Sequence, residues 1–232
     1  TAALAAAFLA TAACAAVPLA FPIVVISALI VLVPGLTVTL AMTELATRNL
    51  VSGAARLAGA LLMFMTIGVG FALGSRTGAL AFGSPAAVDP GAQPVWSEWV
   101  ALAITAGALL VLFRAHPRDY PWFVAIAALA LVGSRAGAAL LGPQLGALVG
   151  AVLIGVVGNA IARFRNRPAL ITQMPGLMLL VPGSLGFRSV AALVEQDTLA
   201  GVQTAFTVVL VAISLVTGLL LANVLLPPRR IL

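Results

Sequence analysis

Charged side chains are rare in this sequence, and a few of them fall inside or beside long apolar runs. A charge within an apolar segment costs several kcal/mol unless it is paired or hydrated, so such residues are candidates for function. Glu44 and Glu195 are candidate proton-coupling acids, because burial of a carboxyl favours its protonated form. Arg135 lies well inside an apolar run and Arg188 lies seven residues before Glu195, and either guanidinium is suited to a carboxylate ligand.

The sequence leaves structural alternatives open for these charges. Glu44 precedes Arg48 by four residues, which is the spacing of an ion pair on one helix face, and Arg56 is a second partner within reach. Arg135 can instead extend along apolar surface toward the edge of the membrane and serve structure alone.

Neutral polar residues gather at two Pro-Gly pairs, each of which interrupts an apolar run. Pro34-Gly35 is followed by Thr37 and Thr39, and Pro182-Gly183 by Ser184. A helix that starts inside the membrane offers free N–H groups to an anion, and the hydroxyls suit a small polar ligand. The alternatives are that the pairs are packing kinks and that the hydroxyls bond back to their own helix.

Gln173 lies just before the second Pro-Gly pair, at a position from which it is predicted to line the same cavity or to sit among the headgroups. Asn159 and Asn223 are typical of hydrogen bonds between membrane helices.

The composition places these residues in a membrane protein. The chain has 232 residues, of which 62% are hydrophobic and 8% charged, with a mean hydropathy of +1.20, whereas soluble domains are about 25% charged. The net charge of +6 is spread in short groups between apolar runs, which argues against nucleic-acid binding. Cys14 and His116 belong to no ligand cluster, so neither a metal nor a cofactor is expected.

Eight apolar runs are long enough, or nearly so, to cross a bilayer core of about 30 Å. We therefore predict an all-α, polytopic membrane protein. The predicted spans are residues 1–17, 19–45, 52–74, 96–114, 121–141, 144–162, 168–193 and 200–226.

The chain repeats itself at an offset of 148 residues, which relates Leu32-Val33-Pro34-Gly35 to Leu180-Val181-Pro182-Gly183 and Gly53 to Gly201. That offset corresponds to five spans, and an odd number of spans turns the second copy upside down. We expect inverted repeats around a central site, with 1–74 as the end of the first repeat, 75–96 as an extracytoplasmic loop and 97–232 as the second repeat. The counterparts of spans four and five would precede residue 1, so we expect a ten-span protein.

The arginines indicate the orientation. Arg48, Arg114 with Arg118, the group at 163–167, and Arg229 with Arg230 all fall on one side when eight spans are counted, whereas Arg76 falls on the other. The rule that basic loops stay in the cytoplasm predicts a cytoplasmic C-terminus for a protein of the bacterial inner membrane.

Segments 19–74 and 168–226, in both of which Pro-Gly is followed by Gly after 17 intervening residues, resemble the two halves of the threonine/serine exporter family. The resemblance implies ten spans, a cytoplasmic N-terminal domain that this sequence lacks, and export of small hydroxy amino acids driven by the proton motive force. Family members often carry an Asp after the first Pro-Gly helix, where this chain has Glu44 and Arg48-Asn49.

Three other functions remain open at this stage. Some relatives are associated with dicarboxylate export, and a channel or a structural membrane subunit would share the composition. A channel is expected to show a ring of charge or a carbonyl filter, which the sequence does not suggest. Lipid, protons and a small amino acid are the expected partners, and a homo-oligomer is compatible with the sequence. No enzymatic motif is present.

Overall fold

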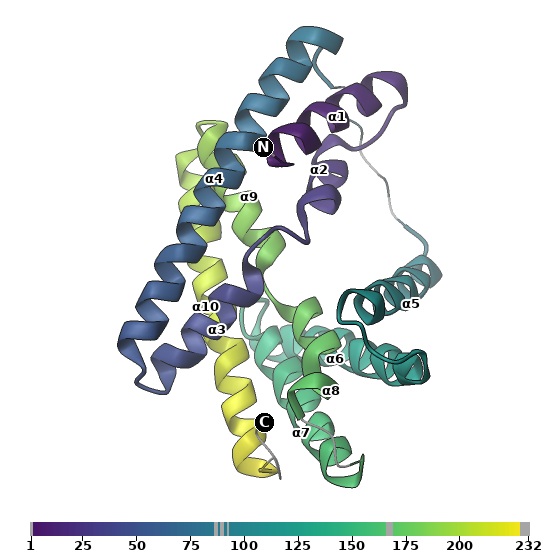
Figure 1. Ribbon diagram of the computed structural model, residues 1–232, viewed down its shortest axis with the longest axis vertical. Coiled ribbons are helices and arrows are strands. Elements are labelled where there is room, and N and C mark those ends of the chain that lie inside the picture. The colour runs from purple at the N-terminus through teal and green to yellow at the C-terminus, as the bar shows by residue number, and fades with distance from the viewer. Residues whose placement is uncertain (1, 86–87, 89–90, 92, 166–168, 228–232) are drawn as a thin grey trace. The chain divides into compact units, whose positions relative to one another are not determined.

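The computed structural model describes residues 2–85, 88, 91, 93–165 and 169–227, without the side chains of 165 and 169–171. In the described residues, every regular secondary-structure element is a helix (Figure 1). Six of its helical segments are long and apolar enough to cross a membrane, which confirms an all-α polytopic membrane protein. The other two predicted spans correspond to the shorter α1 (Ala2–Ala16) and to a helix broken into two pieces, α2 (Phe21–Leu29) and α3 (Gly35–Ala46).

The chain divides into two compact units. The first unit contains residues 1–92 and 182–209, and the second contains 93–181 and 210–232. Besides α1, α2 and α3, the first unit holds α4 (Leu50–Phe82), α9 (Gly183–Val194) and the start of α10 (Thr198–Leu225).

Small residues bring α1 and α4 together in the first unit, where the two helices run side by side (Figure 1). Gly70 lies against Ala3, Gly74 against Ala7, and Gly78 against Thr11. The numbers rise together along both helices, so the pair is parallel, and the four-residue spacing forms the small-residue stripe that lets membrane helices approach closely. The apolar core of this unit then forms where α1, α2, α4 and α9 meet, around Leu29, Phe71 and Phe187.

The second unit consists of α5 (Val95–Leu112), the 3-10 turn η1 (Pro117–Asp119), α6 (Tyr120–Leu141), α7 (Gly146–Arg165), α8 (Ala169–Leu180) and the end of α10. Helices α6, α7 and α8 pack against one another, again through glycines. Gly133 and Gly137 of α6 face Leu153 and Val149 of α7, and Gly218 of α10 faces Ala151 of α7.

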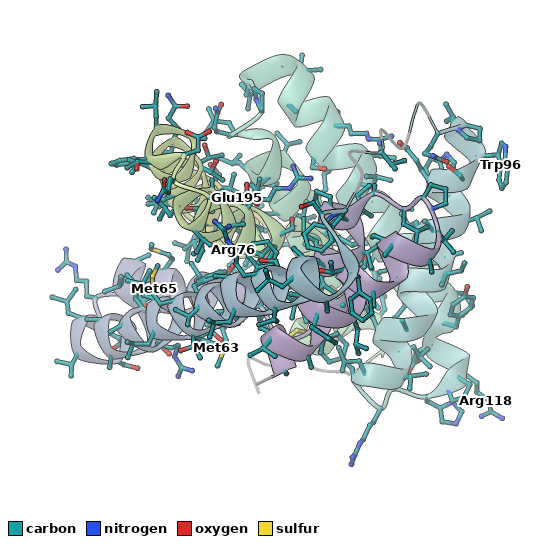
Figure 2. The ribbon with its side chains drawn as sticks, turned by 90° about the horizontal axis from the view of Figure 1, so that it is seen from above. Met63, Met65, Arg76, Trp96, Arg118 and Glu195 are labelled. Atoms are coloured by element: carbon teal, nitrogen blue, oxygen red, sulfur yellow. The ribbon has the colours of Figure 1, made fainter. Side chains whose placement is uncertain are left out.

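Figure 2 shows Trp96 and Arg118 at opposite ends of α5. Both side chains are exposed, the first at the start of the helix and the second in the connection that follows it. An exposed tryptophan at one end and an arginine beyond the other are typical anchors at the two surfaces of a bilayer.

The offset of 148 residues holds in backbone geometry as well as in sequence. Helices α3 and α9 each have 12 residues, and each starts directly after a proline with nearly the same dihedral angles, φ −79° and ψ 38° at Pro34 against φ −79° and ψ 41° at Pro182. The turns that follow each contain a residue with positive φ, 66° at Arg48 and 68° at Gln196.

The helix pairs that flank these turns repeat too. The contact of Gly70 with Ala3 corresponds in register to that of Gly218 with Ala151, and the contact of Gly53 with Leu45 to that of Gly201 with Leu193. The two copies therefore share local fold and packing. The inverted orientation of the second copy, and the loop at residues 75–96 as the boundary between the copies, stay predictions.

The end of α4 departs from the expected span. We predicted that the helix ends at Gly74 and that an exposed loop begins at residue 75, but α4 continues to Phe82 and has 33 residues. The sequence 75–82 contains no proline, and Gly78 and Phe82 extend the packing on α1 through Thr11 and Phe8. At 1.5 Å per residue α4 is about 50 Å long, which exceeds the hydrocarbon core.

Candidate functional site

The first Pro-Gly pair separates α2 from α3. Proline has no N–H group and a fixed φ, so the regular hydrogen bonds of α2 cannot continue through Pro34. The chain instead makes a tight turn in which the Gly35 N–H donates to the Val33 carbonyl at 2.8 Å, and α3 then begins at Gly35. A helix start is thereby placed between apolar segments.

The second Pro-Gly pair starts α9, and the structure brings this helix start next to the first one. A Cβ atom added at Gly183 would lie 3.2 Å from Val33 Cγ1 and 3.7 Å from Gly35 Cα. The two glycines are therefore in near contact within the first unit, and Pro34, Gly35, Pro182 and Gly183 are all buried. A Cβ atom at position 183 would press on the Val33 side chain and touch Gly35 at ordinary van der Waals distance, so a larger side chain such as valine would fill the space between the two helix starts.

Both helix starts carry free hydrogen-bond donors. Within the described residues, the N–H groups of Leu36 and Thr37 in α3, and of Ser184 and Leu185 in α9, have no backbone acceptor. The first N–H groups of a helix and its dipole both favour a bound anion. Two such ends in near contact form a strong candidate for an anion site.

Two hydroxyls accompany these donors. In the described part of the chain the side chains of Thr37 and Ser184 form no hydrogen bond. Neither hydroxyl oxygen is a fully buried atom that lacks a partner. Thr39 differs, because it is buried and its Oγ1 donates to the Gly35 carbonyl at 3.3 Å, as the back-bonding alternative describes. Thr37 and Ser184 are therefore the better candidates for contacting a ligand.

The other end of α3 carries a charged cluster. Arg56 Nε of α4 lies 3.0 Å from Glu44 Oε1, and Ser52 Oγ donates to Glu44 Oε2 at 2.7 Å. Of the two partners considered from the sequence, Arg56 forms the pair and Arg48 does not. Ser52 was not foreseen, although it stands one turn before Arg56. In the second copy the equivalent residues are Ala192, Ala200 and Thr204, so this cluster occurs only once.

Arg135 is paired with a residue that the sequence reading overlooked. Arg135 Nη2 of α6 lies 2.8 Å from Glu98 Oε2 of α5, and both side chains are about half exposed, 56% and 42%. A signal for this pair exists in the sequence, because the two residues are nearly equidistant from the connection at 113–119 and so face each other in an antiparallel helix pair. Arg188 of α9 and Glu195, which directly follows α9, are both exposed, and within the described residues neither forms an ion pair.

Gln173 is buried in the second unit, where α8 meets α7. Its Nε2 donates to the Gly155 carbonyl at 3.2 Å and to Asn159 Oδ1 at 2.9 Å. The amide is thus engaged by α7, and the two positions expected from the sequence, one lining a cavity and one among the headgroups, stay predictions.

Fold and site together define a polytopic membrane protein built on a repeated unit, in which helices broken at Pro-Gly expose N–H groups between apolar segments. Two family models match this chain. "Threonine/Serine exporter, ThrE" matches residues 98–225, and "Putative threonine/serine exporter" matches residues 1–78. The protein belongs to the threonine/serine exporter family.

Curated relatives agree with this assignment. The chain is 28% identical over 204 residues to the "Threonine/serine exporter" of Corynebacterium glutamicum, covering 86% of this chain and 42% of that protein. It is 26% identical over 174 residues to "Pheromone-regulated membrane protein 10" of Candida albicans, covering 69% of this chain and 15% of that protein. The protein of the same name from Yarrowia lipolytica is 25% identical over 209 residues, covering 79% and 16%.

The chain thus spans less than half the length of the curated relatives it matches. No solved structure gave a significant match to it.

Proposed function

We propose that the protein is part of a secondary transporter that exports small hydroxy amino acids such as threonine and serine. The near contact of the two Pro-Gly helix starts, with free N–H groups and the hydroxyls of Thr37 and Ser184, is the observation that supports this proposal. We place the transporter in the bacterial inner membrane with its C-terminal end in the cytoplasm, as the arginine distribution favours.

The site suits an amino acid in the following way. The substrate carboxylate accepts hydrogen bonds from the N–H groups of one helix start, where the dipole also favours negative charge. The substrate hydroxyl exchanges a hydrogen bond with Thr37 or Ser184. The ammonium group is held by carbonyls at the break, where regular helix bonding stops.

Glu44 is the proposed proton-coupling residue, and Glu195 is a second candidate that is exposed at the end of α9. Protonation of Glu44 would remove its ion pair with Arg56, which holds the end of α3 against α4. Helix α3 is only 12 residues long, with Gly35 at its first position and Glu44 near its last, so a change at Glu44 is transmitted along one rigid element to the site.

A second substrate class is supported by one specific feature of the site. Both helix ends that meet here are N-termini, and two N-termini favour two negative groups over one. A small dicarboxylate such as succinate would satisfy both ends. The competition experiment described next separates the two substrate classes.

The test is efflux from proteoliposomes, measured for radiolabelled serine with and without an imposed proton gradient. Thr37→Val and Ser184→Ala each remove one neutral hydrogen bond, worth about 0.5–1.5 kcal/mol, and are expected to weaken serine transport by a few-fold to about tenfold. Thr66→Val is the matched control, because the exposed Thr66 hydroxyl bonds only to the Leu62 carbonyl of its own helix.

Competition by unlabelled substrates identifies the class. We expect serine to compete better than alanine, and expect Thr37→Val or Ser184→Ala to reduce that preference. Gly35→Val and Gly183→Val should stop transport, because they fill the junction of the helix starts. Equal competition by serine and alanine, with stronger competition by succinate, would replace the amino-acid proposal by the dicarboxylate one.

A further inference from the structure

We propose that Gln173 and Asn159 are positioning residues, which fix the place of α8 along α7 through a buried chain of side-chain amides. The proposal rests on the transport function proposed above and concerns residues that do not touch the substrate. Helix α8 leads directly into the second Pro-Gly pair, so its axial position sets where that break begins.

The amide chain joins three helices of the second unit. Gln173 of α8 donates to Asn159 of α7, and Asn159 Nδ2 donates in turn to Asn223 Oδ1 of α10 at 3.0 Å and to the Leu226 carbonyl at 2.7 Å. Asn159 is 0% exposed and Gln173 is 7% exposed. Donors in an apolar interior hold their acceptors firmly, because loss of a bond leaves a buried polar group unsatisfied.

The backbone of α7 is shaped to receive Gln173. A Cβ atom added at Gly158 would collide with Gln173 Cγ and would lie 3.1 Å from its Nε2. The glycine therefore allows the amide to reach both the Gly155 carbonyl and Asn159. A side chain of this kind fixes α8 in one place along α7, since two directional bonds fail together when the helix slides by a turn.

The first repeat forms the corresponding helices without this chain of side-chain amides. Its residues in the same register are Ala10, Thr11 and Val25, in place of Gly158, Asn159 and Gln173. Thr11 donates only to the Ala7 carbonyl of its own helix at 2.8 Å, and Val25 is buried among apolar neighbours. Apolar contacts hold α2 near α1 and provide no directional bond that would fix its axial position. The axial position of α8 along α7, in contrast, is fixed by hydrogen bonds.

Helix α8 has particular features that make hydrogen bonds to a neighbouring helix important for its axial position. It has 12 residues, of which Pro175 lies inside the helix and removes one backbone hydrogen bond. Part of its apolar packing is made at Gly176, where an added Cβ atom would lie 2.9 Å from Ile126 and Ile154, and apolar contacts carry no hydrogen-bond direction. Gln173, one half-turn before Pro175, supplies the directional contact.

The test exchanges the second-repeat residues for those of the first repeat in a triple variant, Gly158→Ala with Asn159→Thr and Gln173→Val. At these three positions the triple variant carries the residues that the first repeat has in the same register, so we expect parental amounts of protein in the membrane. We expect the KM for serine efflux to rise about three- to tenfold, because a displaced break binds the substrate less tightly. The reciprocal exchange Asn159→Gln with Gln173→Asn keeps an amide pair and should restore most of the parental KM.

A distance measurement tests the positioning independently of any substrate. Spin labels at positions 132 of α6 and 179 of α8, in a variant without Cys14, should give one narrow distance in the parent and a broadened or shifted one in the triple variant. Thr11→Val is the control and should change neither KM nor distance.

The outcomes separate this proposal from the proposed function. If the parent protein does not transport serine, but the distance in the triple variant differs from that in the parent, the proposed function is refuted and the positioning role is kept. An unchanged distance together with an unchanged KM in the triple variant overturns the positioning role. If the triple variant is not recovered, Gln173→Met decides, since it removes only the amide, and parental KM and distance there also overturn the proposal.

Discussion

Arg48 and Gln196 occupy a backbone conformation that ordinary residues avoid, and replacing them should stabilise the protein. Their φ angles are 66° and 68°. Each follows the end of a short helix in the same tight turn, in which the Arg48 N–H donates to the Leu45 carbonyl at 3.1 Å and the Gln196 N–H to the Leu193 carbonyl at 3.2 Å. Glycine is the usual residue at such a position.

The size of the effect follows from two opposing contributions. A residue with a Cβ atom loses about 1–2 kcal/mol in the left-handed region. Glycine removes this cost but is more flexible in the unfolded chain, by about 0.5–1 kcal/mol. Both side chains are exposed, and within the described residues neither forms a hydrogen bond or an ion pair, so no contact is lost. Arg48→Gly and Gln196→Gly should each stabilise the folded protein by about 0.5–1 kcal/mol.

Thermal unfolding of the purified protein in detergent measures this effect. For a chain of this size, 0.5–1 kcal/mol corresponds to a rise in Tm of about 1–4 °C. Ala46→Gly is the control, because Ala46 is exposed in the last turn of α3 with helical geometry, and there glycine should lower Tm by a similar amount. A fall in Tm for both Arg48→Gly and Gln196→Gly would refute the strain argument, and opposite signs would refute the equivalence of the two turns.

Three further predictions concern packing, coupling and topology. Gly74→Ala should destabilise the protein, because the added Cβ collides with the Leu4 carbonyl of α1, whereas Gly59→Ala should be neutral or stabilising by up to about 1 kcal/mol, because that Cβ meets open space; thermal unfolding distinguishes the two. Glu44→Gln mimics the protonated acid and should remove the pH dependence of efflux while preserving serine exchange at equal pH, and an unchanged pH profile would assign Glu44 to structure alone. Single cysteines at positions 85 and 165, in a background without the native cysteine, should react with an impermeant reagent from outside and from inside respectively, and reaction of both from one face would refute the inverted topology.

Much of the local fold could be predicted from the sequence, because it depends on residues with strong backbone preferences. Pro34 and Pro182 cannot continue a helix, so the breaks and the starts of α3 and α9 followed directly. The register of 148 residues then predicted which glycines are equivalent, and Gly53 and Gly201 do make equivalent contacts with Leu45 and Leu193.

The end of α4 could not be predicted in the same way. The loop was expected to begin at residue 75, yet the helix continues to Phe82 because Gly78 and Phe82 pack on α1, and the four-residue spacing of Gly70, Gly74 and Gly78 was the signal for this contact. The pairing of Arg135 with Glu98 was accessible in principle, since both lie at similar distances from the connection between α5 and α6.

The comparison of the two copies separates the residues that build the fold from those that act in it. Small residues stand at equivalent helix contacts in both copies, such as Gly70 and Gly218, because close approach of backbones is required in each. Polar groups differ: the Glu44–Arg56 pair occurs only in the first copy and the Gln173–Asn159 pair only in the second.

The other copy forms the corresponding helices with alanine, threonine or valine in place of each pair. Polar and ionisable residues within or beside apolar membrane helices are candidates for function. The unmatched pairs are therefore the positions at which substitution should change transport while leaving the helices assembled, whereas substitution of the glycines at matched helix contacts, such as Gly70 and Gly218, should destabilise the protein.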